Sequence, residues 1–245
     1  MHAFSTDSVK KIENELISNG TESFLLMMRA AYAACQYLLS VSADDIIIFC
    51  GKGNNGGDGY GLAALLHLSN RKIRVIQIEA PKTPEASQAL TLCQNLGIKV
   101  GEYFEFEQVG TWYVDALLGS GLVEAPRAKY ENVIKFLLSE RNKGKSVLSL
   151  DMPSGLNAST GQGYGLVVNA SQTITFLAMK QGILTGDAVD FVGELIFNNL
   201  GENETKIKPD AHILEKNNCD FGHIKPSAHK GTRGSVLVVG GMQGM

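Results

Sequence analysis

The sequence predicts an α/β fold, a doubly wound, three-layer Rossmann-like sandwich with helices on both faces of a mostly parallel sheet. Short apolar runs alternate along the chain with segments of helical periodicity. The runs are continuously apolar rather than alternately apolar and polar, which is typical of strands buried on both faces. Glycine-rich polar turns follow several of these runs, at the positions where ligands bind in such sheets.

Six apolar runs are predicted to be strands because they are rich in branched and aromatic side chains. They are Asp45–Cys50, Ile73–Ile78, Trp112–Val114, Ser146–Leu150, Thr173–Phe176 and Gly193–Phe197. Helices are predicted over residues 7–19, 22–40, 59–69, 84–96 and 127–141. In the second of these, Met28, Ala31, Cys35 and Leu38 recur at the spacing of one helix face.

Composition indicates a globular enzyme. The 245 residues are 44% apolar and 19% charged, enough for one large α/β domain or one domain and part of another. The formal net charge of −3, without a basic stripe, argues against nucleic acid as the main partner. A charged N-terminal segment and the lack of an 18-residue apolar run predict no signal peptide, no membrane span and a cytoplasmic location.

Cysteine and histidine patterns argue against several kinds of site. The four cysteines form no C-x-x-C pair, so neither a disulfide framework nor a metal cluster is expected. The five histidines lack ligand spacing, which argues against zinc. No G-x-S-x-G nucleophile motif is present. Acid–base chemistry is therefore assigned to carboxylates, Asp58, Asp115 or Asp151, or to Lys180 beyond another strand.

The segment Gly51–Gly59 reads Gly-Lys-Gly-Asn-Asn-Gly-Gly-Asp-Gly between a predicted strand and a helix. Glycines let backbone N–H groups approach an anion, and the start of a helix carries partial positive charge, so this loop is expected to hold phosphate. It matches neither the P-loop nor the G-x-G-x-x-G motif. Taken alone, Asn55-Gly56 is equally well read as an ordinary turn.

Two further turns leave predicted strands. Asp115-Ala-Leu-Leu-Gly-Ser-Gly121 follows one strand, and Asp151-Met-Pro-Ser-Gly155 follows another. Asp115 could instead cap the next helix, and the second turn could be a simple proline turn. Because all three segments lie at the same end of one predicted sheet, we expect one shared site with oxygen ligands from Asn55, Asp115 and Ser154.

Together these motifs resemble those of the NAD(P)H-hydrate epimerase family. Leu184-Thr-Gly186, Val192-Gly-Glu194, the early Glu13 and Met27-Met28-Arg29-Ala30 also agree with it, and the resemblance covers residues 7–205 in order. It implies an isomerase of nicotinamide nucleotide repair, which interconverts the R and S forms of NAD(P)H hydrated at carbon 6 of the nicotinamide ring.

The resemblance also implies a set of site residues. Asp151 is expected to contact the hydrated ring and to act as the acid–base group, and Asn55, Asp115 and Ser154 correspond to the ligands of a potassium ion. The residues expected to bind the substrate are Asn54, Asn55, Gly56, Gly57, Asp58, Gly119, Ser120, Gly121, Leu122, Val123, Glu124, Ala125 and Asp151.

A change in composition after about residue 200 predicts a domain boundary. Residues 1–215 are expected to form the epimerase domain and 216–245 a linker with the truncated beginning of a second domain. His229–Met242 resembles the opening of the ADP-dependent NAD(P)H-hydrate dehydratase, a ribokinase-like lyase domain of bifunctional repair enzymes. We expect no dehydratase activity, because the remainder of that domain lies beyond Met245.

Three questions stay open at the level of sequence. The same fold could serve as a non-catalytic module that binds a nucleotide or a protein, although the set of Asn, Asp and Ser oxygens favours catalysis. The expected partner is a small molecule, hydrated NADH or NADPH, rather than nucleic acid or membrane. The chain could act as a homodimer, and neither the oligomeric state nor the preference between the two substrates follows from these motifs.

Overall fold

The computed structural model describes residues 2–103, 110–122, 124–126, 129–202 and 205–213. Within these ranges a seven-stranded sheet has the order β4-β3-β2-β5-β6-β7-β8, and every neighbouring pair is parallel. The strands are β2 Ile46–Cys50, β3 Ile73–Gln77, β4 Val100–Glu102, β5 Trp112–Ala116, β6 Ser146–Leu150, β7 Gln172–Phe176 and β8 Glu194–Asn198. The predicted doubly wound α/β fold is confirmed.

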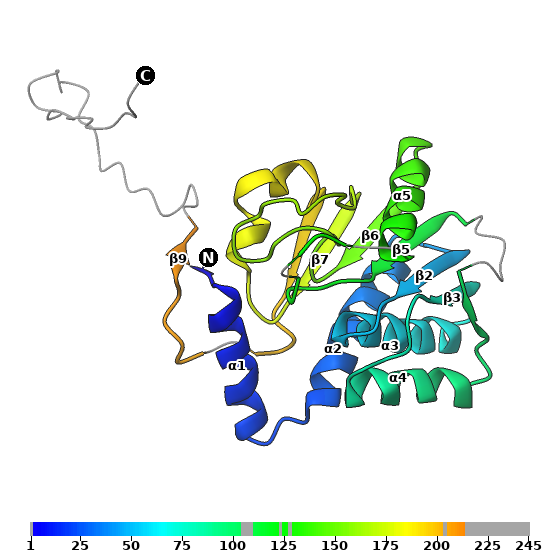
Figure 1. Cartoon of the computed structure of the whole chain (residues 1–245). Helices are drawn as coiled ribbons and strands as arrows, with labels where there is room; N and C mark the ends of the chain where they lie inside the picture. The colour runs from blue at the N-terminus through cyan, green and yellow to red at the C-terminus, as the bar shows by residue number, and fades with distance from the viewer. Residues whose placement is uncertain (1, 104–109, 123, 127–128, 203–204, 214–245) are drawn as a thin grey trace, which may run out of the picture. The chain divides into compact units, whose positions relative to one another are not determined.

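Helices cover both faces of this sheet (Figure 1). The helices are α1 Thr6–Ser18, α2 Ser23–Ser40, α3 Asn54–Leu68, α4 Pro84–Asn95 and α5 Lys129–Asn142, with 3-10 turns at Gln181–Ile183 and Gly186–Asp190. One core joins α2, α3 and α4 to the face that carries Ile46 and Ile48, while Ile47 and Phe49 pack with α5 on the opposite face.

Strand β2 shows why its sequence is apolar throughout. Each of its five residues is fully buried, because odd and even positions point into different cores. Burial of one such aliphatic or aromatic side chain contributes about 1.5–3 kcal/mol. The strand therefore anchors both layers of helices.

The strand order reverses beside β2. The chain proceeds from β2 to β3 and β4 on one side, then returns to place β5 on the other side of β2. Ile46 pairs with Trp112 and Cys50 with Ala116, so β2 and β5 end at the same level. Their connections diverge above this point and leave a crevice, which is where doubly wound sheets bind ligands.

The N-terminal segment ties itself to a loop beyond β7. Strand β1, His2–Ala3, pairs antiparallel with β9, Ala211–His212. The N–H of Phe4 donates to the carbonyl of Met179 at 2.8 Å, and the N–H of Gln181 donates to the carbonyl of Phe4 at 2.9 Å. These two bonds flank Lys180 on both sides and hold its backbone in place.

Several boundaries differ from the sequence prediction. The predicted helix at 59–69 begins at Asn54, so most of the presumed glycine loop is helical. Strand β5 continues to Ala116 and includes Asp115, which was expected to follow it. The short strands β1, β4 and β9 were not predicted, because two or three residues carry no period-2 signal.

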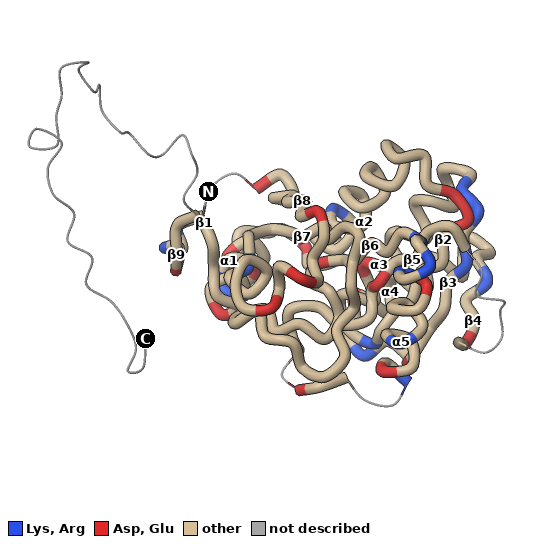
Figure 2. The backbone as a smooth tube through the Cα atoms, turned by 90° about the horizontal axis from the view of Figure 1, so that it is seen from above, with Lys and Arg blue, Asp and Glu red and all other residues tan. Residues whose placement is uncertain are grey.

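The predicted second domain lies almost wholly outside the described residues. The compact unit of the structure comprises His2–His212, and the division at residue 215 stays a prediction. Among the described helices, none has both the length and the apolar character needed to cross a membrane. Acidic and basic residues are both distributed along the described backbone (Figure 2).

Tyr113 on β5 provides a test of the core beneath α5. Its hydroxyl donates to Glu140 Oε2 at 2.8 Å and accepts the Gly110 N–H at 3.2 Å, and its side chain is fully buried. Tyr113→Phe should lower the free energy of unfolding by about 1–3 kcal/mol, because the buried Gly110 N–H loses its acceptor and Glu140 loses a donor. Urea denaturation checks this; Tyr32→Phe, at an exposed tyrosine on α2, should change stability by less than about 0.5 kcal/mol.

Candidate functional site

A cavity of about 820 Å³ opens at the carboxyl ends of the central strands. Its walls come from α1, α2, the start of α3 and the loops that follow β3, β5, β6 and β7. It includes the crevice where β2 and β5 diverge, and its volume is that of a site for a cofactor-sized molecule.

The first turn of α3 lies at the wall of this cavity. Gly53 is the N-cap residue, and no side chain accepts a hydrogen bond there. The first α-helical bond runs from the Gly57 N–H to the Gly53 carbonyl at 3.1 Å, so the N–H groups of Asn54, Asn55 and Gly56 precede the helical ladder. Such a turn, with its partial positive charge, suits a phosphate group.

The glycines of α3 serve packing more than ligand contact. A Cβ atom at Gly56 would lie 1.9 Å from the carbonyl oxygen of Gly51, and one at Gly57 would lie 2.4 Å from Met27 Cε. Gly59 lies against Ala116 and Cys50 in the same way. Gly56 and Gly57, predicted to bind the substrate, therefore face neighbouring elements within α3: Gly56 lies against the backbone that follows β2, and Gly57 lies against α2 and α4.

The loop after β5 forms the facing wall. The predicted residues Gly119, Ser120, Gly121, Leu122, Glu124 and Ala125 all line the cavity, and Val123 lies outside the described residues. A Cβ atom at Gly119 would lie 3.2 Å from Asp151 Oδ2 and 3.3 Å from Asn55 Cβ. Gly119 thus brings three predicted site segments together.

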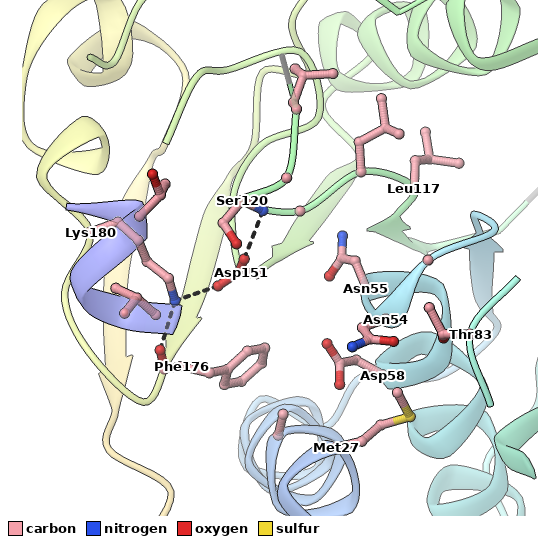
Figure 3. A pocket seen from close by; sticks show the side chains of 18 of the residues that line it. Met27, Asn54, Asn55, Asp58, Thr83, Leu117, Ser120, Asp151, Phe176 and Lys180 are labelled. Atoms are coloured by element: carbon pink, nitrogen blue, oxygen red, sulfur yellow. Dashed lines mark hydrogen bonds and ion pairs between the residues drawn. The ribbon is translucent and has the colours of Figure 1, made fainter. Parts of the chain in front are cut away.

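Asp151 and Lys180 form an ion pair in the cavity (Figure 3). Lys180 Nζ lies 2.5 Å from Asp151 Oδ1, and it also donates to the Phe176 carbonyl at 2.7 Å and to Thr175 Oγ1 at 3.2 Å. The second carboxylate oxygen, Asp151 Oδ2, accepts the Ser120 N–H at 3.1 Å. Both contacts stabilise the negative charge of this carboxylate.

The backbone of Asp151 adopts a rarely populated conformation. Its φ of 66° lies in the left-handed region, although the residue carries a side chain. The N–H of Asp151 donates to the Ile174 carbonyl at 2.8 Å, which continues the sheet hydrogen bonding to that point. The strained turn aims the carboxylate across the sheet edge into the cavity, as occurs at functional sites.

Among the other carboxyl groups that line the same cavity, two are affected by the charge of Asp151. Asp58 projects from α3 towards the side occupied by Asp151 and Lys180 (Figure 3), and Glu13 comes from α1. Burial raises the pKa of Asp58 well above its usual range, and the negative charges of Asp151 and Glu13 add to this rise. Burial is also the main cause that raises the pKa of Glu13, and the negative charge of Asp151 raises it further.

Asp115 lies beneath the cavity rather than in it. It is fully buried, and Ser154 Oγ donates to its Oδ1 at 2.6 Å, while Ser149 Oγ and the Ser154 N–H donate to Oδ2, each at 2.9 Å. Burial raises the pKa of Asp115, against the opposing effect of these hydrogen bonds. Asp115 lies inside β5 and does not line the cavity. It therefore cannot cap a helix, and it cannot exchange protons with a substrate in the cavity.

Asn55 is the unusual polar residue of the site. Its side chain is buried, and within the described part of the chain neither its Oδ1 nor its Nδ2 has a hydrogen-bond partner. An unpaired buried amide costs about 1–3 kcal/mol. The amide therefore gains stability from any bound group that pairs with it. The described residues include no cluster of three or more His, Cys, Asp or Glu side chains arranged for a metal ion.

Comparison with known proteins identifies the family. Residues 23–182 match the family of the YjeF-related protein N-terminus, a range that includes every loop of the cavity from β2 to β7. The chain belongs to this family. Together with the relatives below, this match confirms the expected relationship to NAD(P)H-hydrate epimerases. Helix α1, which supplies Glu13 to the cavity, lies before the matched range.

Relatives of this YjeF-related chain have names that agree with the family. It is 35% identical to the bifunctional NAD(P)H-hydrate repair enzyme Nnr of Coxiella burnetii over 99% of this chain and 51% of that protein, and 34% identical to Nnr of Escherichia coli over 97% and 48%. It therefore spans about half the length of these relatives. The NAD(P)H-hydrate epimerase of Limosilactobacillus reuteri is 30% identical over 74% of this chain and 86% of that protein.

The fold of the YjeF-related chain also has a solved counterpart. The crystal structure of the yeast protein ynu0 superposes with a TM-score of 0.68, covering 74% of this chain and 83% of the yeast chain. At 19% sequence identity this likeness concerns the fold alone. It agrees with the parallel, doubly wound sheet described above.

Sequence reasoning missed some residues of this YjeF-related site. Lys180 was considered for acid–base chemistry but not as the partner of Asp151; its place beyond the predicted strand Thr173–Phe176 was the available signal. Phe176 and Leu177 line the cavity from that same strand end. Glu13 was noted only through the family resemblance, because a helix before the sheet gives no clue to where its side chains point.

The packing role of the glycines can be tested by stability alone. Gly56→Ala should lower the free energy of unfolding by about 2 kcal/mol or more, because its Cβ meets the Gly51 backbone and that contact cannot relax cheaply. Gly53→Ala, with nothing within 4 Å of the added Cβ, should cost about 1 kcal/mol or less. Equal losses in urea denaturation would contradict the assignment.

Proposed function

We propose that the chain interconverts the R and S epimers of hydrated NADH or NADPH. The observation that carries the proposal is the union, in one cavity, of a helix start suited to phosphate and the buried Asp151–Lys180 pair. The name of the 30% identical relative, NAD(P)H-hydrate epimerase, supports the same reaction. So do the names of the longer repair enzymes.

Two parts of the cavity wall suit two parts of such a substrate, its pyrophosphate and its hydrated nicotinamide ring. The pyrophosphate would accept hydrogen bonds from the first turn of α3, with Asn54 beside it and Lys52, paired with Glu79, at the cavity wall. The hydrated nicotinamide ring would then lie near Asp151 and Phe176. The loop Gly119–Ala125 would cover the dinucleotide between these two groups.

The chemistry requires proton transfer but no redox partner. Carbon 6 of the hydrated ring bears a hydroxyl group and the ring nitrogen, so it is a hemiaminal. Ring opening and reclosure, or loss and return of the hydroxyl, would invert this centre. Asp151 is suited to exchange protons with the hydroxyl, because its carboxylate reaches the cavity and its negative charge is supported by Lys180 and Ser120.

Replacement of Asp151 tests this role. Asp151→Asn should slow epimer exchange by about 100- to 10,000-fold, since the amide cannot accept the proton, while the affinity for the hydrated dinucleotide stays within a few-fold. Chromatographic separation of the R and S forms measures the exchange rate. Asp190→Asn, at an exposed residue outside the cavity, is the matched control. Turnover of Asp151→Asn at the rate of the unmodified chain would reject the assignment.

The proposal includes a potassium ion held by Asn55, Asp115 and Ser154. The buried Oδ1 of Asn55 has no hydrogen-bond partner among the described residues, so it is free to bind a cation. Carboxylate and hydroxyl oxygens of Asp115 and Ser154 are hard donors of the kind such ions prefer, although they also hydrogen-bond to each other. When bound, the ion would supply positive charge to the phosphate end of the substrate.

Removal of potassium tests the ion site without reliance on activity alone. Exchange of potassium for tetramethylammonium at constant ionic strength should lower the melting temperature and the rate of epimer exchange, because an ion that binds only the folded state stabilises it. Asn55→Ala should abolish the response of the melting temperature. Asn132→Ala, exposed on α5, should retain it. A potassium response that survives in Asn55→Ala would place the ion elsewhere.

The alternative, a non-catalytic binding module, makes a different prediction for the same assay. Such a module would bind the dinucleotide without changing the rate at which the R and S forms exchange. The charged, strained arrangement at Asp151 favours catalysis over simple binding.

The described cysteines Cys35, Cys50 and Cys93 are buried free thiols, which supports the proposed cytoplasmic location. A homodimer stays a proposal that sedimentation analysis would test.

A further inference from the structure

We propose that Asp58 is the proton donor of the reaction, and that Asp151 is the group that accepts the hydroxyl proton. This inference rests on the proposed epimerisation and divides its acid–base work between two carboxyl groups. Both groups line the same cavity, Asp58 from α3 and Asp151 from the turn after β6 (Figure 3). A proton donor must be uncharged before the reaction and a proton acceptor charged, so their surroundings must differ.

The surroundings of the two carboxyl groups do differ. Asp151 has the Lys180 ammonium on one oxygen and the Ser120 N–H on the other. Within the described residues, the carboxyl groups of Asp58 and Glu13 have neither a hydrogen-bond donor nor an ion-pair partner, although both are partly buried. A carboxylate that is partly removed from water and has no partner is unfavourable, so Asp58 favours the protonated form.

The charge balance of the cavity leads to the same conclusion. Asp58, Glu13 and Asp151 influence one another electrostatically, and the Lys180 ammonium that acts on all three is already bound to Asp151. Burial raises the pKa of Asp58 well above its usual range, and the charge of Asp151 raises it further. The other charged groups that line the cavity or act on Glu13 are Lys10 on α1, Glu85 on α4, and Lys52, Glu79 and Glu124 on the loops.

The position of Asp58 on α3 suits contact with the reacting ring. Asp58 lies four residues after Asn54, so both side chains project from the same face of the helix, one turn of about 5.4 Å apart. A dinucleotide whose phosphates bind at Asn54 would therefore pass Asp58 on its way to Asp151. An ionised Asp58 would repel those phosphates, whereas a protonated Asp58 would not.

The proton transfers balance over one turnover. Asp151 removes the hydroxyl proton, the C6–O bond becomes a carbonyl, and the C6–N1 bond breaks with its electron pair moving to N1. N1 takes the proton of Asp58, which becomes a carboxylate. After rotation about C5–C6, N1 attacks the opposite face of the carbonyl, Asp58 recovers the N1 proton, and Asp151 returns its proton to oxygen. Both groups end in their starting states.

A stability measurement tests the protonation of Asp58 without substrate. The raised pKa means that the folded chain holds a proton on Asp58 that the unfolded chain loses above about pH 4. The free energy of unfolding therefore falls as pH rises from about 4 through the folded-state pKa of Asp58. Asp58→Asn should therefore raise the urea midpoint at pH 7 and leave it unchanged near pH 3. A difference that does not vary with pH would overturn the proposal.

The pH dependence of epimer exchange tests the donor role. In the unmodified chain the rate should fall at alkaline pH as Asp58 loses its proton; Asp58→Asn should lower kcat by about 100-fold or more, with KM changed only a few-fold. Glu13→Gln removes a neighbouring negative charge and should shift the alkaline limb to lower pH. Glu15→Gln, on the same helix but outside the cavity lining, should not shift it. An unchanged kcat in Asp58→Asn, with a raised KM, would reduce Asp58 to a binding residue and overturn the proposal.

Failure of the proposed function gives a separate result. If the unmodified chain does not exchange the R and S forms, the epimerisation and the donor role both fall, yet the pH-dependent stability of Asp58→Asn would still report a protonated carboxyl group. If the unmodified chain exchanges the epimers and Asp58→Asn does so equally fast, only the donor assignment falls.

Discussion

The close approach of α3 to the ends of β2 and β5 is the constraint on which the site depends. The backbone of Gly56 passes so near Gly51 that no side chain is accommodated, and Gly51 itself lies against the carbonyl of Leu117. This contact allows the helix to start three residues after the strand and directs its first N–H groups into the cavity. A helix displaced by even one side chain would carry Asn54, Asn55 and Asp58 away from the loop that follows β5.

A second feature is that Lys180 pairs with Asp151 and leaves the neighbouring carboxyl groups of Asp58 and Glu13 without an ion-pair partner among the described residues. One lysine serves a group of acidic side chains, and its three bonds secure it to Asp151, Phe176 and Thr175. The backbone of Phe4 holds the residues on either side of this lysine, so the N-terminal segment supports the ion pair although it lies before the range of the family match. Helix α1 then completes the wall of the cavity with Glu13. Burial without compensation is what gives neighbouring carboxyl groups different protonation states.

Beneath the cavity, the hydrogen-bonded group of Asp115, Ser149 and Ser154 joins β5, β6 and the turn after β6. Each donor satisfies one lone pair of a carboxylate that is fully removed from water. The arrangement fixes the turn that follows, including the strained residue Asp151. The buried side-chain amide of Asn55, in contrast, has no hydrogen-bond partner among the described residues.

Local sequence patterns were enough to predict the layers, the central strands and the three loops of the site. Hydrophobic runs and glycine-rich turns are local signals, and the rule that parallel strands end at one edge was sufficient to bring Asn55, Gly119 and Asp151 together. Only the tertiary structure decided that Asn54–Gly59 is helical, because the packing that favours it involves Gly51, Met27 and Ala116 from other elements. It also decided which carboxyl group receives Lys180 and which receive none, since burial and charge pairing depend on distances between segments far apart in the chain.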